Sequence, residues 1–360
     1  MKKFLILLVV ALAAISVAVT AALAKPAKST AAADICVLLP DPKSSVRWET
    51  QDRPALVAAF KKAGVSYVIT NADGDAQKQK TQADQCLANG AKVVILVSLD
   101  AGSSIAIEKA AATAGAKVIE YDRQVKGGTS SIYISFDGRR VGVLQGTGVV
   151  NGLKANGMYG KKPVVAELNG GQTDNNSYLF KGGYDSILNP LYKNGTFKKG
   201  PDQFTPGWDN QKALTIFEQM LQKTNNKIDG VLAANDGLAN AAISALKARR
   251  LPQIPITGQD ATLQGIQNIV TGDQCMTVYK PIAQEVDAAA KLATALAKGQ
   301  TPAGVTASTD NGSKKVPSIL LKPISVTKAN VKRYFGRADF PTRAQVCAGN
   351  VASECTTAGL

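Results

Sequence analysis

The stretch AKVVILVSLDAGSSIAIEKAAATAGAKVIEYDR, residues 91–123, contains one complete strand–helix–strand unit. Its apolar runs at 93–97 and 117–121 are short and rich in Val and Ile, which is typical of strands buried on both faces. Between them, residues 103–114 have helical spacing and stop at Gly115. This order predicts parallel strands joined by a right-handed helical crossover.

Units of the same kind occur on both sides of this stretch. Before residue 137, further strands are expected at 35–39, 67–70 and 131–136, and further helices at 54–63 and 76–88. The series then starts again, with strands at 164–168, near Phe204, at 230–234 and at 254–257, and helices at 141–153, 177–188, 210–222 and 238–248. The sequence therefore predicts an α/β protein with two doubly wound parallel-sheet lobes.

Composition excludes several classes of active site. The 360 residues contain no His, so Ser-His-Asp and Cys-His triads and His-ligated metal sites are ruled out. The five cysteines form no C-x-x-C spacing, which argues against a thiolate zinc site or a thioredoxin-type redox pair. The Gly170-Gly171 pair is a weak phosphate-loop signal without a G-x-G-x-x-G or Walker pattern. We expect a binding protein without catalytic residues, metal or cofactor.

The N-terminus has the order of a secretory signal peptide. Lys2 and Lys3 precede an apolar run at 4–22 and the triplet Ala22-Leu23-Ala24, so cleavage is expected after Ala24. The alternative is an uncleaved anchor helix, because the apolar run is just long enough to span a bilayer. Cleavage predicts an extracytoplasmic protein of the periplasm or cell envelope.

The formal charge of +15, from 42 Lys and Arg against 27 Asp and Glu, raises the question of a nucleic-acid partner. The basic residues are scattered in pairs such as Lys61-Lys62 and Arg249-Arg250, with no helix-turn-helix and no RNA-binding signature. We interpret them as solvated faces or as weak attraction to an anionic envelope surface, and expect no nucleic acid.

The five cysteines suggest disulfides, which an exported protein permits. A Cys347–Cys355 bridge is predicted near the C-terminus, with a pair of free thiols as the alternative. A Cys36–Cys86 bridge is the second candidate. Cys36, Cys86 and Cys275 are three, so one of them stays unpaired in any arrangement.

Polar and aromatic side chains follow many of the predicted strands. Ligands of open parallel sheets bind outside the carboxyl ends of the strands, so these residues are candidate site residues. Asp or Asn after a strand is equally often a helix N-cap, an isolated Trp is more often core, and an Arg after Asp is often a surface ion pair. Charged groups, amides and Trp faces together suit a sugar, whose hydroxyls donate and accept and whose C–H face is apolar. The groups that follow the strands are Arg47-Trp48, Asp122-Arg123, residues 169–176 (NGGQTDNN), Trp208, Asn235-Asp236, Gln259-Asp260 and Lys280.

At these positions the sequence resembles the sugar-binding receptors of bacterial ABC importers with the ribose-receptor type of fold, and among them the D-xylose receptors. The resemblance spans roughly residues 35–325. Gly138, where Asn is usual, the cysteines and the C-terminal extension depart from it. The shared strings are RW (47–48), YDR (121–123), YISFD (133–137), DNN (174–176), GW (207–208), NNKID (225–229), ND (235–236), GQDA (258–261) and MTVYKP (276–281).

The resemblance implies two lobes joined by three crossings near Asp137, Asp260 and Lys280, a type I periplasmic binding protein fold. The implied segments are 34–136 plus 261–279 for the N-terminal lobe, 137–260 plus 280–330 for the C-terminal lobe, and 331–360 for a tail.

The resemblance also implies roles for the candidate residues. Trp48 and Trp208 would stack on the two faces of a pyranose. Eight polar residues would bind its hydroxyls and ring oxygen: Arg47, Asp122, Arg123, Asp174, Asn176, Asn235, Asp260 and Lys280. The acids and bases among them nearly balance, which suits a neutral ligand. The implied partners are a monosaccharide, D-xylose or a related aldose, and the permease and ATPase subunits of an importer, with the receptor itself a monomer.

Other functions remain to be weighed. A broader aldose receptor that also serves chemotaxis or a sensor kinase fits the same residues. A glycosidase would use a carboxylate pair from Asp122, Asp174 and Asp260, but Arg123 and Lys280 would keep those acids ionised. A sugar-responsive transcription regulator would carry an N-terminal helix-turn-helix in place of the signal peptide.

Overall fold

The structure is a computed structural model that describes residues 32–360, so the expected signal peptide at 1–24 lies outside the described residues. One sheet has seven strands: β1 (Ile35–Leu39), β2 (Tyr67–Asn71), β3 (Val93–Leu96), β4 (Lys117–Tyr121), β5 (Ile132–Phe136), β10 (Ala307–Asp310) and β11 (Lys315–Leu321). Their order is β10-β11-β5-β4-β3-β1-β2, and all neighbours are parallel except β10 and β11. These elements form the first lobe.

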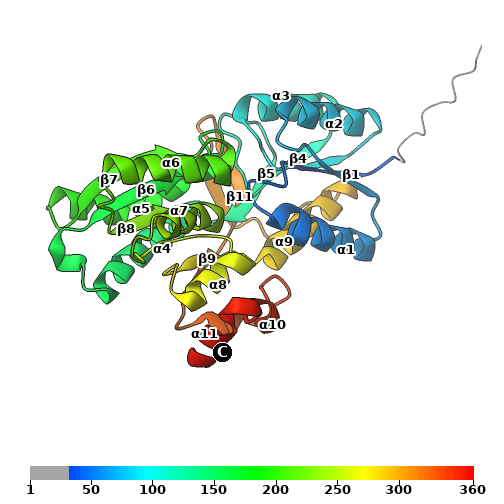
Figure 1. Ribbon diagram of the computed structural model, residues 1–360. Coiled ribbons are helices and arrows are strands. Elements are labelled where there is room, and N and C mark those ends of the chain that lie inside the picture. The colour runs from blue at the N-terminus through cyan, green and yellow to red at the C-terminus, as the bar shows by residue number, and fades with distance from the viewer. Residues whose placement is uncertain (1–31) are drawn as a thin grey trace, which may run out of the picture. The chain divides into compact units, whose positions relative to one another are not determined.

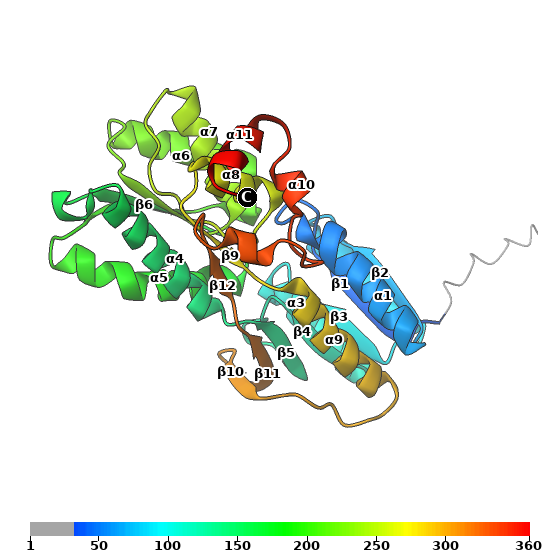
Figure 2. The same cartoon turned by 90° about the horizontal axis from the view of Figure 1, so that it is seen from below.

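Helices cover both faces of this sheet, as the unbroken apolar strands predict. Ile35, Val37 and Leu39 point to the face with the π-helix η1 and with α1 and α9, whereas Leu38 belongs to the core under α2 and α3. Figures 1 and 2 both show α9 beside α1. The bounds are η1 (Trp48–Asp52), α1 (Arg53–Ala63), α2 (Ala76–Ala88), α3 (Ala101–Thr113) and α9 (Ile282–Ala297).

The second lobe has a smaller parallel sheet with strands β6 (Val164–Asn169), β7 (Lys198–Phe204) and β8 (Gly230–Ala233), in the order β7-β6-β8. The strand predicted at 254–257 is reduced to an isolated bridge between Ile256 and Val231. A separate antiparallel pair joins β9 (Thr277–Tyr279) to β12 (Ile324–Val326). The helices are α4 (Gly138–Ala155), α5 (Asn175–Lys193), α6 (Asn210–Lys223), α7 (Asp236–Ala248) and α8 (Leu263–Thr271), with short 3-10 helices η2 (Tyr159–Lys161) and η3 (Pro206–Trp208).

The predicted α/β class with two lobes is confirmed, and the chain crosses between the lobes three times. The crossings lie near Asp137, at Lys280-Pro281 and at Lys322-Pro323. The expected crossing at Asp260 is wrong, because the chain continues into α8, which packs on α7 of the second lobe.

The predicted lobe assignment is therefore wrong for two segments of the chain. Residues 261–279 belong to the second lobe, since β9 pairs with β12 and α8 contacts α7. Most of 280–330 belongs to the first lobe, because α9 packs on β1, β3, β4 and β5, and β11 pairs with β5. The apolar stripe of a helix identifies its buried face but not the sheet that the face covers.

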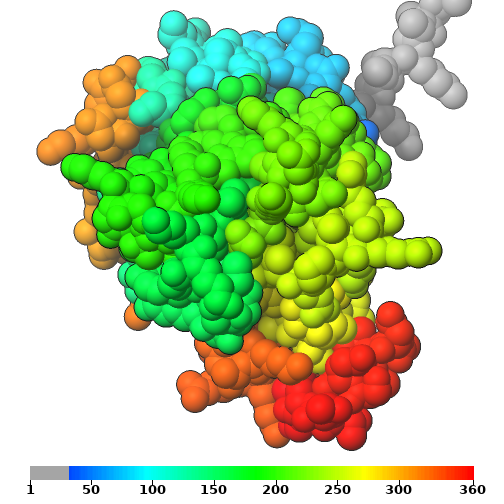
Figure 3. All heavy atoms as spheres, turned by 60° about the vertical axis from the view of Figure 1, so that its left-hand side comes forward, coloured from blue at the N-terminus to red at the C-terminus, as the bar shows by residue number. Residues whose placement is uncertain are grey.

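Residues 331–360 are folded, contrary to the expectation of a tail. Their apolar side chains share a core with Ile266, Ile269 and Tyr279 of the second lobe, and Figure 3 shows them packed against the α8 region. Asp339 accepts hydrogen bonds from the Tyr279 hydroxyl (2.5 Å) and from the Ala283 amide (2.9 Å), on either side of the crossing at Lys280. The elements are η4 (Val331–Tyr334), α10 (Arg343–Val346), η5 (Gly349–Val351) and α11 (Ala352–Thr357).

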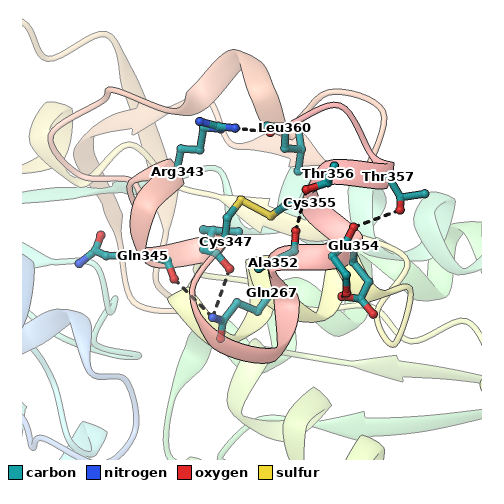
Figure 4. The surroundings of a disulfide bond; sticks show 12 residues. Gln267, Arg343, Gln345, Cys347, Ala352, Glu354, Cys355, Thr356, Thr357 and Leu360 are labelled. Carbon is teal, nitrogen blue, oxygen red and sulfur yellow. Dashed lines mark hydrogen bonds between the residues drawn. A yellow bond between two sulfur atoms is a disulfide. The ribbon is translucent and has the colours of Figure 1, made fainter.

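The structure contains both candidate disulfides. Cys347 is bonded to Cys355, as predicted, and the bridge joins α11 to the end of α10 (Figure 4). Cys36 of β1 is bonded to Cys86 of α2, which leaves Cys275 as the free thiol. Within residues 32–360, no helix is long and apolar enough to cross a membrane.

Candidate functional site

A cavity between the two lobes is lined by all ten residues that the sequence singled out. About 300 Å³ of space in and around it, part of which is open solvent, is free of protein atoms. Four further residues line it: Ser44, Ser45, Phe180 and Gln259. The ten are together because the carboxyl ends of the strands in both lobes face the same cleft.

Asp122 is the central carboxylate of the first lobe. It follows β4 with a φ of 62°, a left-handed conformation that Asp tolerates better than most residues. Its Oδ2 lies 2.8 Å from Nη1 of Arg47 and 3.3 Å from Nζ of Lys280. Burial alone would raise the pKa of Asp122, but Lys280, Arg47 and Arg123 hold it well below its usual range. Asp122 is therefore an ionised hydrogen-bond acceptor at neutral pH.

Asp174 and Asn235 combine the two roles that the sequence left open. Asp174 caps α5 by accepting from the Asn176 amide at 2.9 Å, and Asn235 caps α7 by accepting from the Leu238 amide at 2.9 Å. The second polar atom of each side chain faces the cleft. Oδ2 of Asp174 accepts a hydrogen bond from Nε1 of Trp208 at 3.1 Å, and Nδ2 of Asn235 donates to the Ser44 carbonyl at 3.4 Å. The caps fix these side chains at the cavity wall.

The two tryptophans are held in place by different means. The guanidinium of Arg47 lies 4.4 Å from the ring centroid of Trp48, whose Nε1 donates to Ser44 Oγ at 3.2 Å. Trp208 packs on the backbone of Gly170, where an added Cβ would lie 2.2 Å from two of its ring carbons. The glycine pair that gave a weak phosphate-loop signal thus makes room for an indole ring.

Direct contacts between the lobes surround the cavity. Asn176 Nδ2 donates to Oδ1 of Asp122 at 3.1 Å. Ser45 Oγ donates to Oδ2 of Asp260 at 3.2 Å, and Oδ1 of the same aspartate is 3.3 Å from Nζ of Lys280. The structure is therefore the closed arrangement of the two lobes.

Two acids behind the cavity were not identified from the sequence. Asp52, at the end of η1, and Glu285, in the first turn of α9, are fully buried and bind the guanidinium of Arg47. The sequence does contain an indication that Glu285 is buried. It lies between Ile282 and Val286 on the apolar face of α9, and an acid on such a face is expected to have a buried partner. With these two acids, the buried cluster contains five carboxyl groups and three cations, whereas the residues that line the cavity contain three of each.

Gly138, where the resemblance leads one to expect Asn, does not line the cavity. It is the first residue of α4, and an added Cβ would lie 3.1 Å from the Leu179 side chain and 3.4 Å from Phe180. A larger residue there would press on Phe180, which does line the cavity. In the described part of the chain, no group of His, Cys, Asp and Glu has an arrangement that could hold a metal ion.

Comparison with known proteins gives the family. A family model described as a periplasmic binding protein domain matches residues 35–301. A D-xylose-binding periplasmic protein of Escherichia coli is 38% identical over 287 residues, which are 79% of this chain and 84% of the relative. The chain belongs to the periplasmic binding protein family. This confirms the predicted type of fold.

Other members of the family extend the comparison. A multiple sugar-binding periplasmic protein of Azospirillum brasilense is 33% identical over 318 residues, 84% of this chain and 88% of the relative. A solved ABC transporter solute-binding protein of Clostridium phytofermentans with bound β-D-glucose has a TM-score of 0.79 and 26% identity, and the match covers 87% of this chain and 99% of that one. This periplasmic binding protein is accordingly a substrate-binding protein and not an enzyme, which excludes the glycosidase alternative.

Proposed function

We propose that the protein is the extracytoplasmic sugar-binding component of an ABC importer and that D-xylose is its ligand. The observation that carries the proposal is the convergence of two Trp side chains and eight polar side chains from both lobes on one small cavity. The relatives support it, since a D-xylose-binding protein is 38% identical to this chain. The permease and ATPase subunits of the importer would be its partners, and it would act as a monomer after removal of residues 1–24.

The chemistry of the cavity fits a neutral polyhydroxyl compound. Sugar hydroxyls donate and accept, so the side-chain oxygens of Asp122 and Asp260 would accept from them while Lys280 and the arginines donate. Trp48 and Trp208 would cover the apolar faces of the ring.

The choice between D-xylose and D-glucose rests on one substituent. The two pyranoses share every ring stereocentre from C1 to C4 and differ only in the hydroxymethyl on C5. Fitting an extra CH₂OH into a close-packed site costs about 1–3 kcal/mol, with an additional cost for burying an unpaired hydroxyl. We therefore expect about a hundredfold preference for D-xylose. The second candidate is a broader aldose receptor, which the multiple sugar-binding relative and the glucose-bound relative favour.

Calorimetric titration of the mature protein with D-xylose and D-glucose tests both candidates. Heat from D-xylose with a Kd about a hundredfold below that of D-glucose supports the first. Similar affinities, or heat from D-glucose alone, overturn the assignment to D-xylose and favour the broader receptor. No heat from any aldose overturns the sugar-receptor proposal itself.

A further inference from the structure

Arg47 is held by three buried carboxylates. Nε donates to Oδ2 of Asp52 at 2.9 Å, and Nη2 donates to Oδ1 of Asp52 at 2.8 Å and to Oε2 of Glu285 at 2.6 Å. Nη1 donates to Oδ2 of Asp122 at 2.8 Å. Four of the five N–H groups of the guanidinium are thus occupied within the described residues, and three of them point away from Asp122.

The position of Glu285 decides which way Arg47 faces. It lies in the first turn of α9, one turn after Lys280, and reaches Arg47 from behind the cavity. One Nη2 hydrogen of Arg47 is donated to Asp52 and the other to Oε2 of Glu285. Only Nη1 is then directed at Asp122 and the ligand site. The other oxygen of Glu285, Oε1, is buried and has no hydrogen-bond partner among residues 32–360.

We propose that Glu285 is a positioning residue for the ligand site and that it acts as a neutral carboxylic acid, holding the guanidinium of Arg47 in the orientation that aims Nη1 at Asp122. This inference rests on the proposed function, because its consequence is measured as sugar affinity. Glu285 does not line the cavity, so it acts on the ligand through Arg47.

The charges around Glu285 favour its neutral form. The groups that face it are Arg47, Asp52, Tyr121, Asp122, Tyr133 and Lys280. Asp122 is held ionised by its cations, and Asp52 takes two hydrogen bonds from Arg47 and one from the Tyr121 hydroxyl at 2.6 Å. Glu285 accepts one hydrogen bond and Asp52 accepts three. Protonating Glu285 therefore costs less than protonating Asp52. Burial raises the pKa of Glu285 to about 8, since the pull of Arg47 is opposed by Asp122 and Asp52.

The first measurement needs no sugar. A carboxyl whose pKa is higher in the folded than in the unfolded protein makes folding bind a proton, so its contribution to stability falls as pH rises between the two values. We expect the free energy of unfolding of wild type to fall, relative to Glu285→Gln, between about pH 4.5 and pH 8. Glu167 is also buried with a raised pKa but pairs with Lys181 in the second lobe, so Glu167→Gln should show a change of the same sign in stability and serves as the positive control. A constant difference between wild type and Glu285→Gln overturns the neutral acid.

The second measurement is D-xylose affinity against pH. Wild type should lose affinity between pH 7 and pH 9.5, because ionising Glu285 adds a third negative charge to those of Asp52 and Asp122 around Arg47 and changes how the guanidinium is shared among them. Glu285→Gln should bind like wild type at pH 7 and keep that affinity at pH 9.5, whereas Glu167→Gln should follow wild type. Glu285→Ala frees the Arg47 guanidinium and should bind at least tenfold more weakly at every pH.

The outcomes separate this inference from the proposed function. Wild type that binds sugar with a pH profile parallel to that of Glu285→Gln, or a folded Glu285→Ala with wild-type affinity, overturns the positioning role alone. Wild type that binds no aldose at any pH overturns the proposed function, and the role of Glu285 in ligand binding with it.

Discussion

Arg123 and Asp174 form an ion pair across the cleft, with Nε of the arginine 3.1 Å from Oδ2 of the aspartate. Arg123 follows β4 in the first lobe and also donates to Ser44 Oγ at 2.9 Å, whereas Asp174 caps α5 in the second lobe and binds the indole of Trp208. Both side chains are buried. The pair therefore joins the two lobes at the wall of the cavity.

The closed arrangement should depend on ligand. Burying ion pairs such as Arg123–Asp174 costs desolvation that their mutual attraction does not fully offset, so without sugar the lobes should open and rehydrate these charges. We expect small-angle scattering to give a smaller radius of gyration with saturating D-xylose than without it. A polyol that produces no heat in calorimetry is the control. An unchanged radius with saturating ligand would show that the cleft is closed beforehand.

Asp260→Ala should weaken sugar binding strongly. Removing this carboxylate leaves Lys280, 3.3 Å from Oδ1, and the sugar hydroxyls underpaired in a buried site. We expect a loss of about 2–4 kcal/mol, or about thirtyfold to nearly a thousandfold in affinity. Asp260 has a φ of 94°, which Asn tolerates better than Ala, so Asp260→Asn removes the charge with less backbone strain. Comparing the two variants separates the effect of the lost charge from that of strain. Asp287→Ala, which removes an exposed ion pair with Lys291, should leave the affinity unchanged.

Gly170→Ala should impair binding through Trp208. The new methyl group would lie 2.2 Å from the indole ring, so the ring must move from the cavity wall. The affinity should fall about as far as in Trp208→Ala, for which we expect a loss of about 2–4 kcal/mol. Gly160→Ala is the control, since an added Cβ meets nothing within 4 Å there. Wild-type affinity in a folded Gly170→Ala protein would mean that stacking on Trp208 contributes little.

One geometric rule brings the polar groups that follow the strands to the cavity, and the family resemblance selects individual residues among them. Parallel strands present their carboxyl ends at one edge, so the rule places Asp122-Arg123 after β4 and Asn235-Asp236 after β8 near the ligand cleft, and the resemblance selects Asn235 from the second pair. The same rule does not reach Glu285, which lies on a helix 238 residues from Arg47 in sequence. Only its acidic side chain on an apolar face indicates a buried partner.

The lobe boundaries could not be derived in the same way. The stripe that includes Ile282 and Val286 requires a sheet to cover, and either sheet would satisfy it. The C-terminal segment shows no periodicity because its helices are short and its core is an aromatic cluster. In that cluster the ring of Phe340 lies 5.1 Å from that of Tyr279 and 5.7 Å from that of Tyr334. The contact between Phe340 and Tyr279 joins residues that are distant in sequence, so no local pattern indicates it.

The two disulfides should stabilise the fold to different extents. A bridge stabilises mainly by restricting the unfolded chain, and the restriction grows with the length of the closed loop. Cys347 and Cys355 are 8 residues apart, so replacing both with Ser should lower the free energy of unfolding by about 2–3 kcal/mol. Cys36 and Cys86 are 50 residues apart, and the same change there should cost about 4 kcal/mol.

Denaturant unfolding of the two double Ser variants and of oxidised wild type measures both differences, with peptide mapping to verify the bridges. Cys275→Ser is the control, because the Cys275 thiol is free and closes no loop. Alkylation of Cys347 in the unreduced protein would contradict the short bridge. The same loss of stability in both double variants would contradict the loop-length argument. In that case local packing must dominate, either around Cys355, which shares a core with Ile266 and Tyr279, or around Cys36 against the α2 helix.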